Sequence, residues 1–247
     1  MKLLIDIGNT AIKFATLNGD KISFIDRFYT RELSNKLLDK VLGNFKFDSV
    51  YISSVVPKIQ SQIDEYFIKK YQLTPHYIKV GDYPNIKVKI DNPNELGIDL
   101  YCDIVAGYKR SQELNKPVIV VDLGTATKLL LIKDDGVFTS CAILPGINMS
   151  KKVLSSSTAL LPEVERFEVK KVVDARNTKE VINSSVYYGH IEMINGLLNR
   201  IEKEINENCY YIITGGDASY VHQEIKKPNE LSPYLCFEGI KEIINRG

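Results

Sequence analysis

Short apolar runs alternate with amphipathic stretches along the whole sequence, and this pattern predicts an α/β fold. The apolar runs rich in β-branched and aromatic residues predict strands at 2–6, 11–17, 21–29, 49–55, 117–123, 126–133, 137–143 and 210–214. Helical spacing of apolar residues predicts helices at 31–42, 57–71, 98–114, 179–206 and 237–245. Residues 73–97 contain three prolines and are expected to be mostly loop.

One strand–turn–strand pattern occurs twice. "KLLIDIGNTAIKFATL" at 2–17 and "VIVVDLGTATKLLLI" at 118–132 align Asp6 with Asp122 and Gly8 with Gly124. Each copy continues into further strands, and each half later has a strand that ends in small polar residues, "YISSVVP" and "YIITGGDA". A unit that occurs only twice is typical of two facing domains rather than a solenoid. We therefore expect domains at 1–115 and 116–247 with a cleft between them.

The repeat suggests a role for the carboxylate at the end of each buried strand. In a duplicated fold, equivalent strand tips face the cleft, and a glycine in the following turn lets backbone N–H groups approach a phosphate. An aspartate there can hold Mg²⁺ or its waters beside the phosphates. The sequence has neither the P-loop spacing nor a GxGxxG turn at a strand–helix junction. A buried aspartate that only caps its turn remains the structural alternative.

Composition narrows the functional class. The chain has 247 residues, 44% of them hydrophobic and 26% charged, which is ordinary for a globular protein. The net charge of +1 gives no reason to expect binding to nucleic acid or to a membrane surface. The four cysteines are widely separated, and no leader or membrane-spanning run is apparent, so we expect a cytoplasmic protein. The basic pair Lys151-Lys152 is expected on a solvated face.

The motifs together resemble a known family. The DxGNTxxK block at 6–13 and "DLGTATK" at 122–128 are similar to the acetate kinase, sugar kinase, Hsp70 and actin superfamily. "ISSVVP", "NPNELGID" at 92–99, "AILPGI" at 142–147, Asn177-Thr178 and "ITGGDA" at 213–218 follow in an order that resembles type III pantothenate kinases. The resemblance implies duplicated ribonuclease H-like (actin-like ATPase) domains with mixed central sheets. It also implies ATP-dependent phosphorylation of pantothenate to 4'-phosphopantothenate, the first step of coenzyme A synthesis.

The resemblance assigns roles residue by residue. It implies that the ATP phosphate loop comprises Asp6, Ile7, Gly8, Asn9, Thr10, Ala11, Ile12 and Lys13, with Thr125 as a further ATP contact. It makes Asp99 the general base, and it places Gly97, Ile98, Asp99, Leu100 and Thr178 at the substrate. Asp122 matches the position that binds an activating K⁺ or NH₄⁺ ion, and Mg²⁺ is expected with ATP. From the residues alone, Asp99 could instead be a carboxylate favoured by the dipole of a helix N-terminus.

Two departures from the family pattern leave the acceptor open. Leu100 stands where the family commonly has arginine, and Ile90 stands where a tyrosine often precedes the Asn-Pro pair. A kinase of the same fold with another hydroxyl acceptor is therefore one alternative to a pantothenate kinase. A non-catalytic ATP-binding regulator is another, although the presence of Asp6, Asp99 and Asp122 argues against it.

A homodimer is also expected. The resemblance implies that the regions of Asp122 and Thr178 in one subunit help to complete the acceptor pocket of the other. The predicted helix at 181–201 carries many apolar residues and has more apolar width than one core face needs.

Overall fold

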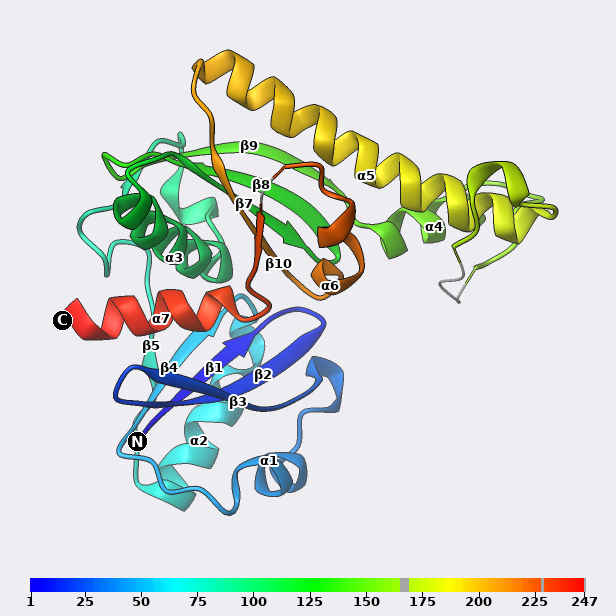
Figure 1. Cartoon of the computed structure of the whole chain (residues 1–247). Helices are drawn as coiled ribbons and strands as arrows, with labels where there is room; N and C mark the ends of the chain where they lie inside the picture. The colour runs from blue at the N-terminus through cyan, green and yellow to red at the C-terminus, as the bar shows by residue number, and fades with distance from the viewer. Residues whose placement is uncertain (165–168, 228, 247) are drawn as a thin grey trace. The chain divides into compact units, whose positions relative to one another are not determined.

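The fold is built on two β-sheets that repeat one strand order (Figure 1). The computed structural model describes residues 1–164, 169–227 and 229–246. Its strands are β1 (Lys2–Ile7), β2 (Ala11–Asn18), β3 (Lys21–Tyr29), β4 (Ser49–Ser54), β5 (His76–Tyr77), β6 (Lys87–Val88), β7 (Val118–Leu123), β8 (Ala126–Ile132), β9 (Val137–Pro145), β10 (Tyr210–Thr214) and β11 (Asn229–Leu231). Its helices are α1 (Asn35–Leu42), α2 (Gln60–Tyr71), α3 (Ile98–Leu114), α4 (Ile147–Ser156), α5 (Thr178–Ile205), α6 (Ala218–Val221) and α7 (Leu235–Arg246). Short 3₁₀ turns are η1 (Thr30–Glu32), η2 (Pro57–Ile59), η3 (Pro93–Glu95), η4 (Val172–Asp174) and η5 (His222–Glu224).

The strand orders show the duplication directly. The first sheet runs β3-β2-β1-β4-β5, and the second runs β9-β8-β7-β10-β11 with β6 added beside β9. In the first sheet β1 pairs antiparallel with β2 and parallel with β4, and β10 pairs parallel with β7 at the equivalent place in the second. The strand β1 therefore corresponds to β7, and β4 corresponds to β10, as the sequence repeat predicts.

The chain divides into two compact units, each with its own core. One unit comprises residues 1–114, 132–139 and 234–247, and the other comprises 115–131 and 140–233. The C-terminal helix α7 therefore groups with the first unit, whereas the sequence repeat places it in the second half. Spatial grouping and sequence duplication are different properties, so the domain limits 1–115 and 116–247 stay a prediction.

The core of the first unit lies between its sheet and the helices α1 and α2. Buried apolar residues from β1, β2 and β4 pack there against Leu38 and Leu42 of α1 and against Ile63 and Phe67 of α2. The helices α3 and α7 also pack together, and α7 contacts β1 and β4. Gly239 of α7 lies against the backbone of Cys102 in α3, where a Cβ would come within 1.9 Å of the Cys102 carbonyl oxygen. Only glycine allows the two helices to approach this closely.

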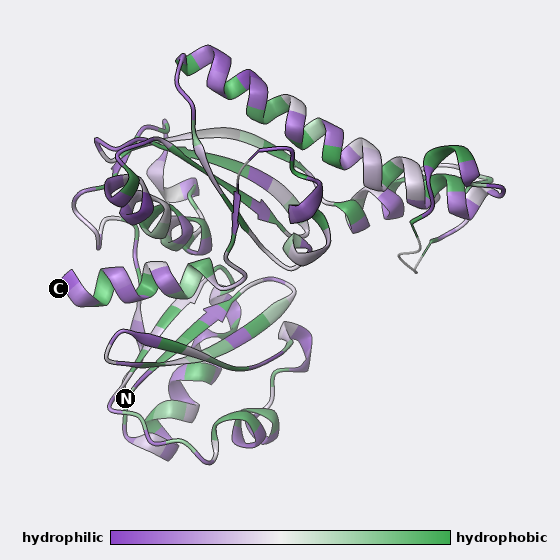
Figure 2. Cartoon of the chain, in the orientation of Figure 1, coloured by the Kyte–Doolittle hydropathy of each residue, from purple (hydrophilic) through white to green (hydrophobic). Residues whose placement is uncertain are grey.

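The core of the second unit lies between its sheet and the long helix α5. Hydropathy alternates along α5, as expected for a helix with one buried face (Figure 2). Its buried apolar residues are Ile182, Tyr187, Ile191, Ile194, Leu198 and Ile201. The sequence analysis inferred an apolar face on this helix that is wider than its core contact needs. Of the apolar residues behind that inference, Val181 is the one large side chain that is exposed, at 49%. The apolar residues along 181–201 that were expected to be left over for a partner therefore mostly pack into the core of this unit.

All the predicted helices and strands are present, with small differences at their ends. The structure adds elements that were not predicted, namely β5, β6, β11, α4 and α6. The expected helix at 31–42 begins at Asn35, because the Ser34 side chain caps it by accepting a hydrogen bond from Leu37 N. The helix α4 was not predicted, and it buries Lys151, so the expectation that this lysine is solvated is wrong. Within the described ranges, every helix is too short or too polar to cross a membrane.

Candidate active site

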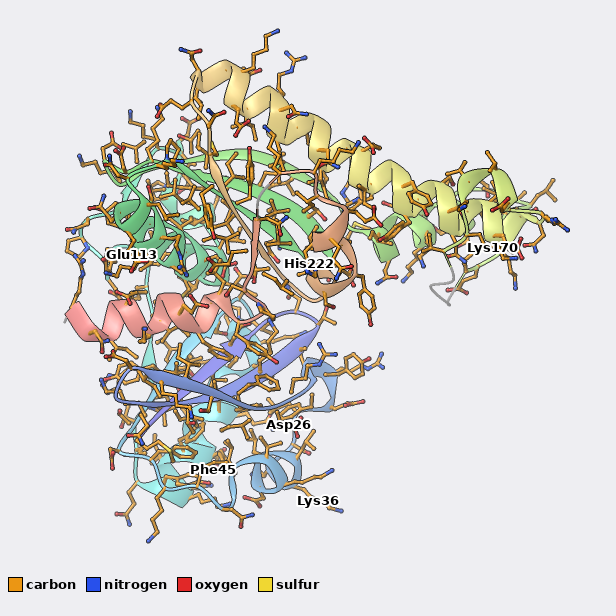
Figure 3. The ribbon with its side chains drawn as sticks, viewed as in Figure 1. Asp26, Lys36, Phe45, Glu113, Lys170 and His222 are labelled. Atoms are coloured by element: carbon orange, nitrogen blue, oxygen red, sulfur yellow. The ribbon has the colours of Figure 1, made fainter. Side chains whose placement is uncertain are left out.

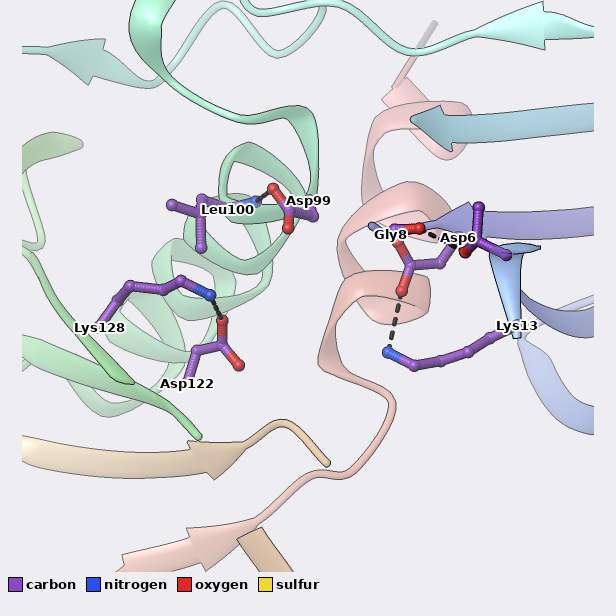
Figure 4. Close-up of polar contacts among 8 residues, drawn as sticks. Asp6, Gly8, Lys13, Asp99, Leu100, Asp122 and Lys128 are labelled. Atoms are coloured by element: carbon purple, nitrogen blue, oxygen red, sulfur yellow. Dashed lines mark hydrogen bonds and ion pairs between the residues drawn. The ribbon is translucent and has the colours of Figure 1, made fainter. Parts of the chain in front are cut away.

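The carboxylate of Asp6 lies at the buried end of β1 in the first unit. It is 5% exposed and pairs in register with Ser53 of the parallel strand β4. Its Oδ2 accepts a hydrogen bond from Nζ of Lys13, at 3.0 Å, across the β1–β2 hairpin (Figure 4). Burial alone would lower the pKa of Lys13, but the charge and hydrogen bond of Asp6 raise it above its ordinary value. Lys13 therefore keeps its positive charge at neutral pH.

Two buried oxygens at this strand end lack hydrogen-bond partners among the described residues. They are Oδ1 of Asp6 and Oγ of Ser53. A buried acceptor without a partner is uncommon, because leaving one unsatisfied costs about 1–3 kcal/mol. The remaining lone pairs of a carboxylate are suitable for a hard cation, its waters or a phosphate-bound ligand. The Asp6 position is thus equipped to bind a group from outside the chain.

The turn after Asp6 presents exposed polar side chains from an ordered backbone. Gly8 N donates to the carbonyl of Ala11 at 3.0 Å, and Thr30 Oγ1 donates to the carbonyl of Gly8 at 2.6 Å. Asn9 and Thr10 are exposed at the tip of this turn. The backbone is therefore held in place while the tip remains accessible, as a phosphate-binding turn requires.

Asp99 lies in the first turn of α3, close to the ends of β1 and β4. Its Oδ1 accepts a hydrogen bond from Leu100 N at 2.8 Å, and a Cβ on Gly97 would come within 2.6 Å of the same oxygen. That Cβ would also lie 3.5 Å from Cγ1 of Val55, whose N–H donates to the carbonyl of Ile7. The Gly97 backbone therefore connects Asp99 to the strand ends. The "DIGNT", "ISSVVP" and "GID" motifs meet in one unit.

The second unit repeats the carboxylate–lysine pair. Asp122, near the end of β7, accepts a hydrogen bond on Oδ2 from Nζ of Lys128 at 2.6 Å (Figure 4). The next residues form the exposed turn at Thr125. Lys128 is thus the counterpart of Lys13, although its spacing from the aspartate is one residue shorter.

Two glycines bring other motifs onto this second turn. Gly146, in "LPGI", donates its N–H to the carbonyl of Thr125 at 3.0 Å, and a Cβ there would lie 2.2 Å from the carbonyl oxygen of Gly124. Gly215, in "TGGDA", lies against Leu123 and Asp122 with a φ of +97°. The motifs of the second half therefore converge on Asp122 as those of the first half converge on Asp6.

Thr178 does not belong to this convergence. It is exposed and is the first residue of α5, which Asn177 caps by accepting a hydrogen bond from Glu180 N. Figure 3 shows Lys170 beside this end of the helix, where its Nζ pairs with Glu180. Of the residues predicted to bind substrate, Gly97 to Leu100 are contiguous with the Asp6 cluster, whereas Thr178 is the first residue of α5 and belongs to the other unit.

Two buried polar pairs in the second unit were missed by the sequence analysis. Lys151 donates to Oδ1 of Asn183 at 3.3 Å; burial lowers its pKa, while the charge of Asp217 opposes that shift. Burial likewise raises the pKa of Asp217, opposed by Lys151. The second pair joins Oγ1 of Thr127 to Nε2 of His190 at 2.9 Å. The sequence offered one signal for the first pair, which was the presence of Asp217 in the "TGGDA" motif. Sequence spacing could not show that Lys151 or His190 is buried in this unit.

Comparison with known proteins identifies the family. The family model described as type III pantothenate kinase matches residues 2–200. The chain belongs to the type III pantothenate kinase family. It is 35% identical to the type III pantothenate kinase of Persephonella marina, with 98% of each chain covered. It is 30% identical to that of Listeria monocytogenes serotype 4a, over 100% of this chain and 97% of the relative.

A solved structure shares the fold. The conserved putative Baf family transcriptional activator from Campylobacter jejuni matches with a TM-score of 0.60 and 20% identity, and 99% of this chain and 98% of that chain are covered. The fold is the duplicated ribonuclease H-like, actin-like ATPase architecture predicted from the sequence. The prediction that the Asp6 and Asp122 clusters share one cleft stays a prediction.

Proposed function

We propose that this chain transfers the γ-phosphoryl group of ATP to the hydroxyl group of pantothenate and forms 4'-phosphopantothenate, the first step of coenzyme A synthesis. Membership of the family over nearly the whole chain is the observation that carries this proposal. The convergence of the phosphate turn, the β4 end and Asp99 in one unit supports it. The site thus offers a phosphate-binding turn next to a positioned carboxylate.

Asp99 serves as the general base in this proposal. It accepts the proton of the attacking hydroxyl, the hydroxyl oxygen bonds to the γ-phosphorus, and ADP leaves with the electrons of the broken P–O bond. The hydrogen bond from Leu100 N stabilises the charged carboxylate and fixes its direction. Phosphoryl transfer depends mainly on positioning and charge stabilisation, so a carboxylate fixed by local backbone meets the requirement.

The residues at the end of β1 fit the Mg²⁺ that a kinase uses with ATP. Oδ1 of Asp6 is buried and unpartnered among the described residues, and an aspartate oxygen is a preferred Mg²⁺ ligand or second-sphere acceptor. When bound, Mg²⁺ neutralises charge on the phosphates. Residues 6–13 form the phosphate loop in this proposal, with Lys13 holding Asp6 in place, and Thr125 contributes from the second unit.

Asp122 is the position that the family resemblance assigns to a K⁺ or NH₄⁺ ion. This carboxylate already has the ammonium group of Lys128 on Oδ2. The proposed function needs a single positive charge at Asp122. Because Lys128 already contacts this carboxylate, either its ammonium group or a bound ion can supply that charge.

Acceptor recognition is assigned to Gly97, Ile98, Asp99, Leu100 and Thr178. Leu100 is partly exposed beside Asp99 and offers no charge to a substrate carboxylate where the family commonly has arginine. This observation favours a second candidate, a kinase of the same family whose acceptor lacks the carboxylate of pantothenate. Thr178, exposed at the start of α5, suits a contact to the acceptor pocket of a neighbouring subunit.

A homodimer is the assembly we propose. Exposed apolar side chains occur on α4, on η4 and at the start of α5, and both α4 and η4 pack against α5 in the second unit. They are Met149, Val153, Val172, Val173 and Val181, and we call them the apolar end patch. A patch at the same end as Thr178 suits a second copy of the chain, because docking there would also carry Thr178 to the partner. The proposal involves no nucleic acid or membrane and places the enzyme in the cytoplasm, where ATP is supplied.

An acceptor series tests the function. ADP release is measured with ATP and Mg²⁺ plus pantothenate, its uncharged amides or no acceptor. The proposal expects stimulation by pantothenate well above the acceptor-free rate. Stimulation by the uncharged amides alone would favour the second candidate. ATP binding without stimulation by any acceptor would instead indicate a regulator and contradict both kinase assignments.

A further inference from the structure

The ion pair between Lys128 and Asp122 is short and shielded. Nζ lies 2.6 Å from Oδ2, and the two side chains are 19% and 14% exposed. A charge-assisted hydrogen bond of this length is at the strong end of the range, and solvent and salt screen it far less than a surface pair. One full positive charge is therefore fixed on the Asp122 carboxylate by the chain itself.

The other carboxylate oxygen has little open space on its glycine side. A Cβ on Gly215 would come within 2.6 Å of Oδ1 of Asp122, so the Gly215 backbone itself lies close to that oxygen. Gly124 also approaches, with its Cβ position 3.8 Å from Oδ1. Asp122 thus has a lysine ammonium on one oxygen and main chain beside the other.

The equivalent pair in the first unit shows a contrasting arrangement. Asp6 has Lys13 on Oδ2 at 3.0 Å, while Oδ1 has no hydrogen-bond partner among the described residues. Both aspartates therefore pair with a lysine of the following strand, but the orphaned buried oxygen occurs at Asp6.

We propose that the Lys128 ammonium is the monovalent cation of the Asp122 site, so that this enzyme needs no K⁺ or NH₄⁺ for activity. An ammonium group carries the same single charge as either ion and, like NH₄⁺, binds oxygen through N–H donors. Because the group is covalently attached, it occupies the carboxylate without any dependence on salt concentration. The inference rests on the proposed kinase function for its activity readout.

A purely structural ion pair is the competing explanation, and cation dependence separates the two. Removal of a structural lysine would weaken the fold without creating a site for a free ion. Removal of a lysine that replaces an ion should create a binding site for that ion. The substitution is Lys128→Ala, and Lys203→Ala is the matched control, because Lys203 is an exposed lysine of the same unit at the end of α5.

Each protein is assayed in choline chloride and in KCl at equal ionic strength, by pantothenate-dependent ADP release and by melting temperature. Wild type and Lys203→Ala should show rates within about twofold in the two salts. Lys128→Ala should be at least about tenfold slower in choline chloride and should recover in KCl or NH₄Cl. Its melting temperature should also rise by at least about 2 °C in KCl, because an ion that binds only the folded state stabilises it.

Wild-type activity that falls more than tenfold when K⁺ is removed would overturn the inference. So would a Lys128→Ala variant whose melting temperature does not respond to K⁺. If wild type shows no pantothenate-dependent turnover in either salt, the proposed function fails, and the melting temperatures still decide the cation question independently.

Discussion

Gly215→Ala tests the convergence of the second-half motifs on Asp122. Gly215 has a φ of +97°, which strains any residue with a Cβ. The added Cβ would lie 2.4 Å from the carbonyl oxygen of Leu123 and 2.6 Å from both its carbonyl carbon and Oδ1 of Asp122. Most of these atoms are backbone at the end of β7, a strand with neighbours on both sides in the sheet order, so they cannot move cheaply.

The magnitude follows from three contributions. Positive φ costs about 1–2 kcal/mol for a residue with a Cβ, and overpacking adds about 1–3 kcal/mol. Displacing the Leu123 carbonyl also weakens its hydrogen bond from Asp217 N, at 2.9 Å, which contributes about 1 kcal/mol. A loss of about 3–6 kcal/mol should lower the melting temperature by about 6–24 °C in a chain of this size.

The matched control is the neighbouring glycine. A Cβ on Gly216 meets no atom within 4 Å, so Gly216→Ala should change the melting temperature by no more than about 2 °C. Both variants are followed by thermal unfolding with circular dichroism. If Gly215→Ala melts within 2 °C of wild type, Gly215 does not pack on Asp122 and the described convergence is wrong.

Three further perturbations test other parts of the account. Asp6→Asn removes the charge that pairs with Lys13 and the carboxylate offered to Mg²⁺. Both kcat and the apparent affinity for MgATP should therefore fall by at least about tenfold in an ADP-release assay. An unchanged affinity for MgATP would contradict the role assigned to Asp6. Burial lowers the pKa of His190 below its ordinary 6.5, so the unfolded state binds its proton more readily and stability should decline as the pH falls through and below about 6.5. Denaturant unfolding between pH 7.5 and 5.5 should show this decline reduced in His190→Gln, and an identical slope in that variant would exclude His190 as a contributor. Val173 is 89% exposed in the apolar end patch, so Val173→Glu should lower the mass measured by light scattering from that of a dimer toward that of a monomer. A wild-type protein that is fully active as a monomer would refute the dimer.

The sequence predicts the features that depend on local pattern. Apolar runs rich in β-branched and aromatic residues placed β1 and β2 correctly. The ion pair between Asp6 and Lys13 was not predicted, although the two residues lie opposite each other in the register of the hairpin. The repeat placed Asp122 at the equivalent strand end. These features need only the near neighbours of each residue.

Other features depend on contacts between distant segments and could not be read from pattern. The burial of Lys151 depends on α5 supplying Asn183, and no local signal distinguishes this lysine from its exposed neighbour. The packing of α7 on α3 depends on one glycine meeting one backbone carbonyl, a match that spacing does not encode. The exposed apolar surface was expected along α5 but gathers at its start, because the rest of the helix packs into the core.

The central claim is that Asp99 takes the hydroxyl proton of pantothenate during transfer of the γ-phosphoryl group. The most direct measurement is the rate of phosphopantothenate formation, quantified by mass spectrometry, for wild type and Asp99→Asn with MgATP. The asparagine keeps the shape and an acceptor for Leu100 N but lacks the basic carboxylate. The account predicts phosphorylated pantothenate from wild type, with turnover lower by about 10²–10⁴-fold in Asp99→Asn and ATP affinity nearly unchanged. Near-wild-type turnover by Asp99→Asn would contradict it and leave Asp99 as a carboxylate at the start of a helix.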